Sequence, residues 1–196
     1  METTKKIGCV VMAAGNAQRF GENKLSAALH GRSLIVRALE SVPTEHFDTV
    51  VVVTQYPEIM RLAGEFHFAA VHNPHPDYGI SHTIQLGLTG LRDCSGVLFL
   101  VSDQPLLKRE SVGKLVELWK ENPEKIAAVS HNGVRGNPCL FPARFFPELL
   151  ELREDSGGNT VIRRHEEDLM LLEVEKQELT DIDTPEAMNE LRRECE

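Results

Sequence analysis

A segment that combines glycines with cationic side chains follows the apolar run Ile7–Ala13 near the N-terminus. From residue 13 it reads A-A-G-N-A-Q-R-F-G-E-N-K. Glycines allow backbone amides to approach a ligand closely, and such amides can surround phosphate oxygens. Arg19 and Lys24 would add positive charge, the arginine as a two-pronged donor and the lysine as a point charge. The segment therefore predicts a phosphate-binding loop.

This loop differs from two common phosphate-binding patterns. The Walker A pattern has four residues between its glycines and then Lys-Ser or Lys-Thr, whereas five residues separate Gly15 from Gly21 here. The dinucleotide-binding pattern G-x-G-x-x-G is also absent from the sequence. An ordinary glycine-containing surface loop with two cations is the alternative interpretation of this segment taken alone.

Carboxylates occur at two later places where a cation could bind. Asp103 directly follows an apolar run over 96–102, and its oxygens could hold Mg²⁺. Asp181 and Asp183 lie two residues apart in an extended segment, so both side chains would face the same side and could approach one cation. The alternatives are that Asp103 caps a turn and that Asp183 or Thr184 caps the final helix.

Two further segments are polar and contain glycine. Residues 78–83 (YGISHT) open a predicted helix, where free backbone N–H groups and hydroxyls could contact a ligand. Residues 133–138 (GVRGNP) resemble either a substrate-binding loop or a plain hairpin turn. The eight histidines form no HExxH or H-x-H cluster, so a histidine zinc site is not expected.

Alternating strand and helix patterns would position these segments. Apolar, β-branched runs predict strands, and apolar residues repeating on one helical face predict helices. This alternation favours an α/β fold with a mostly parallel sheet, in which ligands bind beyond the carboxyl ends of the strands. Strands are predicted at 7–13, 49–54 and 96–102 and, from weaker patterns, at 68–72 and 126–130; helices are predicted around 34–39, 84–91, 112–119 and 186–193.

Composition and charge exclude several classes of protein. With 196 residues, 41% hydrophobic and 26% charged, the chain is typical of a globular protein and favours one domain over residues 1–196. The 21 basic and 30 acidic residues give a net charge of −9, which disfavours binding to nucleic acids or anionic membranes. An anionic substrate would therefore need local cationic side chains or a divalent metal.

The cysteines and the N-terminus indicate a cytoplasmic protein. The four cysteines lie far apart, which favours free thiols in a reducing compartment. Lys5 and Lys6 precede an apolar run that is short for a signal peptide and passes directly into a polar segment. No stretch approaches the roughly 20 apolar residues of a membrane span.

Taken in order, these segments resemble the MobA-like nucleotidyltransferase family, and most closely its molybdenum cofactor cytidylyltransferase branch. The resemblance implies a three-layer Rossmann-like fold and cytidylyl transfer from CTP to the phosphate of molybdopterin, with Mg²⁺ as cofactor and a molybdenum hydroxylase as a candidate recipient of the product. It rests on A-G-x-x-x-R-x-G-x-x-K at 14–24, G-I-S at 79–81, S-D-Q-P at 102–105, G-N-P at 136–138 followed by Phe141, and D-I-D-T-P at 181–185.

The resemblance also implies roles for individual residues. Arg19 and Lys24 would contact the triphosphate, Asp103 would hold the metal, and the turn at 79–81 would line the nucleobase pocket. The implied catalytic residues are Arg19, Lys24 and Asp103; the implied nucleotide-binding residues are Ala13, Ala14, Gly15, Arg19, Lys24, Gly79, Ser81 and Asp103; the candidate metal ligands are Asp103 with Asp181 or Asp183.

The branch assignment depends mainly on Ala14. Cytidylyl enzymes of the family tend to carry Ala-Ala-Gly here, whereas guanylyl enzymes tend to carry Ala-Gly-Gly, and the absent Cβ would leave room for a purine. A GTP-dependent enzyme, a sugar-phosphate nucleotidyltransferase and a non-catalytic carrier of the molybdenum cofactor are the alternatives.

Two departures from the family pattern affect the predicted site. Gln85 stands where a cation is expected, and the stretch 154–159 (EDSGGN) lacks an arginine that relatives often carry. Arg135, Arg163 and Arg164 are the candidates for the missing contact with the acceptor phosphate.

Overall fold

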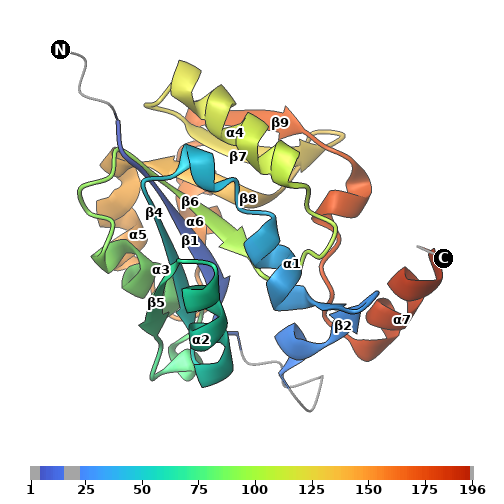
Figure 1. Cartoon of the computed structure of the whole chain (residues 1–196). Coiled ribbons are helices and arrows are strands. Elements are labelled where there is room, and N and C mark those ends of the chain that lie inside the picture. Colours follow the sequence, from blue (N-terminus) through green and yellow to red (C-terminus); the bar gives the residue numbers. More distant parts are fainter. Residues whose placement is uncertain (1–4, 16–22, 195–196) are drawn as a thin grey trace.

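The computed structural model describes residues 5–15 and 23–194, and these form a seven-stranded sheet in the order β5-β4-β1-β6-β8-β7-β9 (Figure 1). Strand β8 is antiparallel to both neighbours, and the other pairings are parallel. The predicted mostly parallel sheet is therefore confirmed. The strands are β1 (Ile7–Ala13), β4 (Thr49–Thr54), β5 (Ala69–His72), β6 (Gly96–Val101), β7 (Ile126–His131), β8 (Val134–Pro142) and β9 (Leu169–Glu173), with a separate hairpin of β2 (Ala28–Leu29) and β3 (Arg32–Ser33).

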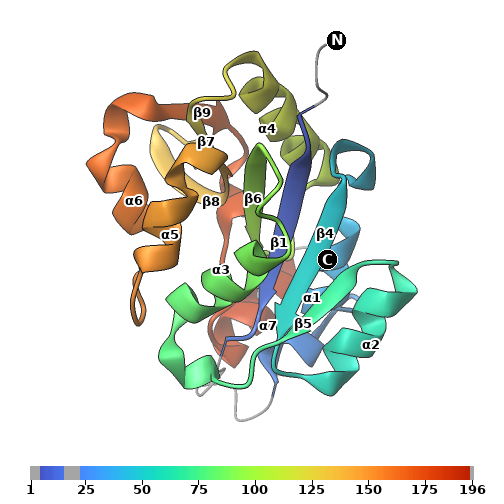
Figure 2. The same ribbon diagram turned by 90° about the vertical axis from the view of Figure 1, so that its left-hand side faces the viewer.

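Helices cover both faces of the sheet, which gives the predicted three layers (Figure 2). Alternate residues of β1 belong to different cores, because successive side chains of a strand point to opposite faces: Val11 packs with α1 and α4, and Val10 packs with α3. The helices are α1 (Leu34–Glu40), α2 (Pro57–Glu65), α3 (Ile80–Thr89), α4 (Arg109–Glu121), α5 (Phe146–Glu151), α6 (Gly158–Arg164) and α7 (Pro185–Glu194).

The strand order reverses between β1 and β6. From β1 the chain builds β4 and β5 on one side and then returns through α3 to place β6 on the other. Such a reversal opens a crevice beyond the carboxyl ends of the two strands. The Ser102 hydroxyl, just after β6, donates to the Met12 carbonyl of β1 at 2.9 Å and ties the two strand ends together. The crevice in which a ligand site is expected therefore lies beyond the ends of β1 and β6.

The polar segment 133–138 divides between a hairpin turn and a strand. Asn132 and Gly133 have φ of +50° and +74°, as a tight two-residue hairpin requires. The pairing then shifts, from Ser130 with Arg135 to Ala128 with Cys139, so that 136–138 bulge opposite a single residue of β7. The hairpin interpretation is confirmed for the turn, and the bulge lies near the crevice.

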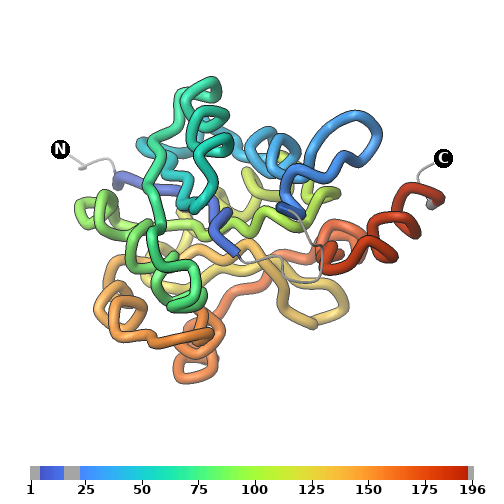
Figure 3. The backbone as a smooth tube through the Cα atoms, turned by 90° about the horizontal axis from the view of Figure 1, so that it is seen from below, coloured from blue at the N-terminus to red at the C-terminus, as the bar shows by residue number. Residues whose placement is uncertain are grey.

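Helix α7 and the small β2–β3 hairpin lie at the same end of the molecule (Figure 3). The Arg192 guanidinium donates to the Ala28 carbonyl at 2.6 Å, and the buried Leu191 belongs to the same core as the buried residues of α1.

Within the part of the chain that the structure describes, no helix has the length and apolarity needed to cross a bilayer. Cys9, Cys94 and Cys139 are buried free thiols.

The contact between α3 and β1 can be tested with Gly87→Ala. A Cβ at Gly87 would lie 2.6 Å from Cγ1 of Val10, a short and stiff side chain in the central strand. We expect the free energy of unfolding to fall by about 1–3 kcal/mol, as overpacked cores do, measured by urea denaturation. Gly64→Ala in α2 is the matched control: nothing lies within 4 Å of its Cβ, so it should be neutral or stabilising by up to about 1 kcal/mol. Equal effects of both substitutions would contradict this packing.

Candidate active site

A cavity of about 560 Å³ lies at the predicted edge, between the ends of β1 and β6 and the start of α3. Its walls come from the glycine loop, the segment after β6 and the turn before α3. The residues that line it include Ala14, Gly15, Lys24, Gly79, Thr83, Ser102, Asp103 and Asp155. Three sequence segments that were predicted separately, by glycine, cation or carboxylate content, therefore surround one space.

Lys24 lies between two carboxylates in this cavity. Its ammonium Nζ is 2.9 Å from Asp103 Oδ2 and 3.1 Å from Asp183 Oδ1. The lysine is held at the start of a short 3₁₀ turn (Lys24–Ser26), where the Asn23 side chain accepts a hydrogen bond from Leu25 N and the Leu25 side chain is buried. The lysine side chain is only 16% exposed, so its charge is directed at the carboxylates rather than at bulk water.

The carboxylate-rich segment 181–183 lies beside the end of β6 through a backbone contact. Ile182 N donates to the Asp103 carbonyl at 2.9 Å, and the Ile182 side chain is fully buried. Asp181 and Asp183 flank this anchor: Asp183 contacts Lys24, and Asp181 accepts a hydrogen bond from Gln104 Nε2 at 2.9 Å. Asp183 therefore lies beside Lys24, whereas Asp181 is among the residues that line a separate cavity, and the binding of one cation by both stays a prediction.

The charges of this cluster shift the pKa values of its members. Burial alone would lower the pKa of Lys24, but the charge of Asp103 and the hydrogen bonds to Asp103 and Asp183 outweigh it and raise the pKa. Partial removal from water raises the pKa of Asp181, and the negative charge of Asp103 raises it further. Lys24 therefore stays protonated, and the three carboxylates together carry more negative charge than one ammonium neutralises.

The donor set suits a hard divalent cation. Asp103, Asp181 and Asp183 offer carboxylate oxygens, the ligands that Mg²⁺ and Mn²⁺ prefer, and the raised pKa of Asp181 reflects its partial burial first and the negative charge of Asp103 second. In the described residues Lys24 lies between Asp103 and Asp183.

The first residues of the glycine loop, Ala14 and Gly15, contact the segment after β4. The Gln55 side chain donates to the Ala14 carbonyl at 3.0 Å, and the Tyr56 hydroxyl donates to the Gly15 carbonyl at 3.2 Å. Ala14 and Gly15 line the cavity, whereas Ala13 is buried in β1 and does not. Arg19, the second predicted cation of the loop, lies outside the described residues.

The turn before α3 closes the opposite wall. Gly79 has φ of +80°, and a Cβ there would lie 2.4 Å from the backbone carbonyl of Glu154. Ser81 N donates to the same carbonyl at 3.1 Å, and the Ser81 side chain is buried behind the cavity wall. Ser81 is not among the residues that line the cavity, and its contact with a nucleotide stays a prediction. Thr83, two residues further along, lines the cavity, and its hydroxyl accepts a hydrogen bond from the Asn73 carboxamide.

Of the three candidate arginines, Arg135 lies closest to this region. It lines a second, smaller cavity of about 270 Å³ that shares Met12, Ile80 and Val101 with the first, and its guanidinium contacts the Asn159 carboxamide. Arg163 and Arg164 lie in the last turn of α6, where Arg164 pairs with Glu148.

The smaller cavity also contains a buried thiol. Burial raises the pKa of Cys139 to about 11, so this thiol is not a nucleophile at neutral pH.

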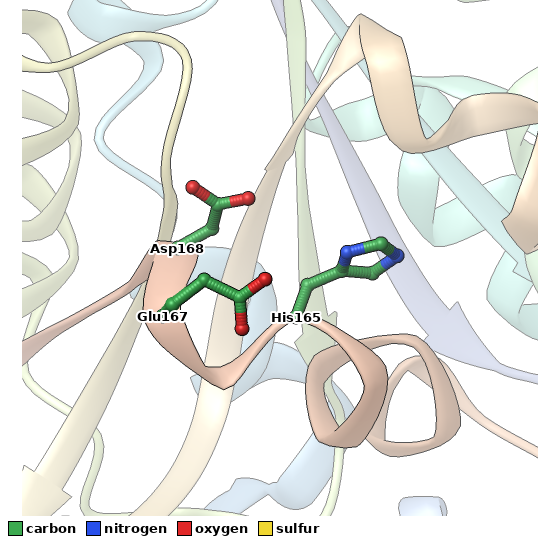
Figure 4. Close-up of side chains that lie close together, drawn as sticks. All are labelled: His165, Glu167 and Asp168. Atoms are coloured by element: carbon green, nitrogen blue, oxygen red, sulfur yellow. The ribbon is translucent and has the colours of Figure 1, made fainter.

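A separate group, His165, Glu167 and Asp168, has ligand atoms within 4.8 Å of one another (Figure 4). These residues precede β9 and so lie at the amino ends of the parallel strands, away from the cavity. His165 Nε2 already contacts Glu148 at 2.7 Å, and Asp168 pairs with Arg144 at 2.6 Å. This group is explained by local ion pairs.

A family model described as the MobA-like NTP transferase domain matches residues 9–169. The chain belongs to this family. The match includes the glycine loop, the turn before α3 and Asp103, and it ends before the segment that carries Asp181 and Asp183.

The names of proteins similar to this chain indicate different activities. The chain is 28% identical to the purine catabolism protein PucB of Bacillus subtilis over 94% of this chain and 95% of that protein. It is 27% identical to 2-C-methyl-D-erythritol 4-phosphate cytidylyltransferase of Dehalococcoides mccartyi over 66% and 60% of the two chains. It is 32% identical to a probable molybdenum cofactor guanylyltransferase of Aquifex aeolicus over 58% and 54%.

Solved structures support the fold. Rv0371c of Mycobacterium tuberculosis superimposes with a TM-score of 0.81 at 18% identity, over 97% of this chain and all of that one. A second structure of that protein, with a TM-score of 0.76, is a complex with manganese. The nucleotidyltransferase fold is thus shared with proteins of low sequence identity.

The electrostatic role of Lys24 can be tested with Lys24→Met. Removing the ammonium leaves Asp103 and Asp183 unneutralised, so we expect Mn²⁺ without nucleotide to bind about 10-fold more tightly, measured by electron paramagnetic resonance of free Mn²⁺. Lys120→Met, which removes an exposed lysine paired with Glu117, should leave Mn²⁺ affinity unchanged. Weaker Mn²⁺ binding in Lys24→Met would contradict this role.

The turn before α3 can be tested with Gly79→Ala. Both Gly79 and Gly133 have positive φ, so alanine at either position costs on the order of 1 kcal/mol of backbone strain. Only at Gly79 does the new Cβ meet backbone, whereas nothing lies within 4 Å at Gly133. We expect nucleotide affinity to fall about 10-fold or more in Gly79→Ala but not in Gly133→Ala, measured by calorimetric titration. Similar nucleotide affinities in the two variants would indicate that the nucleotide does not contact this turn.

Proposed function

We propose that this protein transfers a cytidylyl group from CTP to the phosphate of molybdenum-bound molybdopterin, giving the cytosine dinucleotide form of the cofactor and pyrophosphate. The observation that carries the proposal is the position of Lys24 between Asp103 and Asp183, in a cavity that Ala14 and Gly15 also line. A bound triphosphate requires a carboxylate that holds a cation, a lysine, and backbone N–H groups beside a glycine.

The reaction needs positioning and charge neutralisation more than proton transfer. An oxygen of the acceptor phosphate attacks the α-phosphorus of CTP, a new P–O bond forms, and the bond to the β-phosphate breaks as pyrophosphate leaves in line. The acceptor oxygen is already ionised, so no general base is required. Lys24 and Arg19 would stabilise the charge that builds on the triphosphate oxygens.

A divalent cation bound by Asp103, with Asp181 or Asp183, would supply the remaining positive charge. The proposed cation is Mg²⁺, the smaller of the two hard cations that the carboxylates suit. This arrangement matters more in a chain of net charge −9, because the surface alone would repel both anionic substrates.

The preference for CTP over GTP is assigned to Ala14. Its Cβ occupies the loop at the position where a glycine would leave space for a purine, and Ala14 lines the cavity. GTP remains the second candidate nucleotide because a relative of 32% identity is named as a guanylyltransferase. The name of PucB makes purine-oxidising molybdenum hydroxylases the first recipients to test for the product.

The proposal is tested by pyrophosphate release from purified protein with Mg²⁺ and molybdopterin cofactor, comparing CTP with GTP, ATP and UTP. We expect release with CTP, reduced about 100-fold or more in Asp103→Asn, because one negative metal ligand is lost. Asp93→Asn, an exposed aspartate outside the cavity, should retain full activity.

Pyrophosphate release with GTP alone would support nucleotidyl transfer but would contradict the proposed role of Ala14 in the preference for CTP. Tight binding of molybdopterin without pyrophosphate release from any nucleotide would favour the carrier alternative.

A further inference from the structure

The smaller cavity, of about 270 Å³, differs in charge from the nucleotide cavity beside it. Among the described residues that line the smaller cavity, Arg135 is the only charged one. The larger cavity, by contrast, is lined by Asp77, Asp103 and Asp155 as well as by Lys24. In a chain of net charge −9, a cavity whose described lining contains a cation and no carboxylate is suited to an anionic ligand.

The guanidinium of Arg135 lies at the wall of the smaller cavity and has no carboxylate partner among the described residues. Its Nη1 is 3.9 Å from the sulfur of Cys139, and its Nη2 donates to the carboxamide oxygen of Asn159. Cys139 and Asn159 both line this cavity, so the two ends of the guanidinium lie beside it. A partly buried cation with only neutral neighbours is stabilised when an anion binds next to it.

Two carboxamides add hydrogen-bond donors at this end of the cavity. A guanidinium can only donate, so the oxygen of Asn159 faces Arg135 and its NH₂ group faces away from Arg135. Asn137 lines the same cavity, and its carboxamide oxygen lies 3.7 Å from the Cys139 sulfur. A two-pronged guanidinium with amide N–H groups nearby is the donor set that phosphate oxygens accept from most favourably.

The rest of the cavity suits a carbon skeleton next to the phosphate. Apolar side chains line its other walls, among them Ile84, Phe99, Phe141 and Leu149. Apolar walls also lower the local dielectric constant, which strengthens the attraction between a guanidinium and an anion. Met12, Ile80 and Val101 line both this cavity and the nucleotide cavity, so a group bound at Arg135 would lie beside a bound nucleotide.

We propose that the smaller cavity binds the phosphate monoester of the acceptor substrate, with Arg135 and Asn159 as donors to its oxygens. The inference rests on the proposed function, which requires an acceptor that carries a phosphate, and it assigns that phosphate a place. The two anionic substrates are then held by different cations, the triphosphate by Lys24 and the acceptor phosphate by Arg135. Arg163 and Arg164, the other candidate arginines, do not line this cavity.

The test uses phenyl phosphate, a phosphate monoester with an apolar group, without nucleotide or metal. Binding is followed by the phosphorus chemical shift in a nuclear magnetic resonance titration. We expect Arg135→Met to weaken phenyl phosphate binding about 10-fold or more, because a charge-assisted contact is lost. Asn159→Asp should weaken it similarly, because it places a carboxylate of nearly the same size beside the guanidinium. Arg163→Met is the matched control: this exposed arginine lies outside the cavity, and the variant should keep the wild-type affinity.

Two comparisons locate and identify the bound phosphate. Lys24→Met should keep the affinity for phenyl phosphate within about twofold, because distant sites contribute independently; a loss in Lys24→Met without a loss in Arg135→Met would place the phosphate at the glycine loop and overturn the proposal. Inorganic phosphate should bind less tightly than phenyl phosphate, because it leaves the apolar walls uncovered. Tighter binding of inorganic phosphate would overturn the assignment to an acceptor monoester.

No binding of phenyl phosphate to the wild-type protein, or unchanged affinity in Arg135→Met and Asn159→Asp, would also overturn the proposal. Should Arg135→Met fail to fold, as judged by circular dichroism, the exposed substitution Asn159→Asp decides the outcome.

Failure of this inference is distinguishable from failure of the proposed function. Pyrophosphate release from CTP in which Arg135→Met leaves the KM for the acceptor unchanged would retain nucleotidyl transfer and reject the phosphate site. Phenyl phosphate binding that depends on Arg135, in a protein that releases no pyrophosphate, would retain the phosphate site and reject the catalytic proposal.

Discussion

The ion pairs of Lys24 with Asp103 and Asp183 are the interaction on which the candidate site depends. They join residues that lie 79 and 159 positions apart in the chain and hold the glycine loop, the end of β6 and the segment before α7 against one another. The reversal of strand order between β1 and β6 makes this convergence feasible, because it opens a crevice where helices do not cover the strand ends. The ion pairs of Lys24 and the reversal of strand order therefore bring these segments together at the same edge of the sheet.

This arrangement resolves a difficulty that the composition raises. In the proposed reaction, a protein of net charge −9 has to bring two anionic substrates together, and its general surface would repel both. The partly buried lysine concentrates positive charge where water is partly excluded, and in the proposal the surrounding carboxylates bind a cation that arrives with the nucleotide.

Much of the fold follows from local pattern, and the exceptions have physical reasons. Strands β1 and β4 have the predicted bounds, because continuous apolar, β-branched runs are typical of strands buried on both faces. Strand β8 was not predicted, since its glycine and proline residues normally argue against a strand and are accommodated here by a bulge. Lys24, Asp103 and the acidic pair could be predicted from residue type and order. The burial of Ser81 and the hydrogen bond of Gln104 could not, because each depends on tertiary contacts with residues far along the chain, Glu154 and Asp181.

In the proposed mechanism, the carboxylates around Lys24 bind the cation that accompanies a nucleoside triphosphate. Anomalous diffraction from crystals grown with CTP and Mn²⁺ would locate this cation, because the Mn²⁺ position is determined independently of the protein atoms. We expect a metal peak about 2.1–2.3 Å from an oxygen of Asp103 and from triphosphate oxygens, with Lys24 moved from Asp183 toward the phosphates. A metal peak at His165, Glu167 and Asp168 instead, or a nucleotide bound away from the glycine loop, would contradict it.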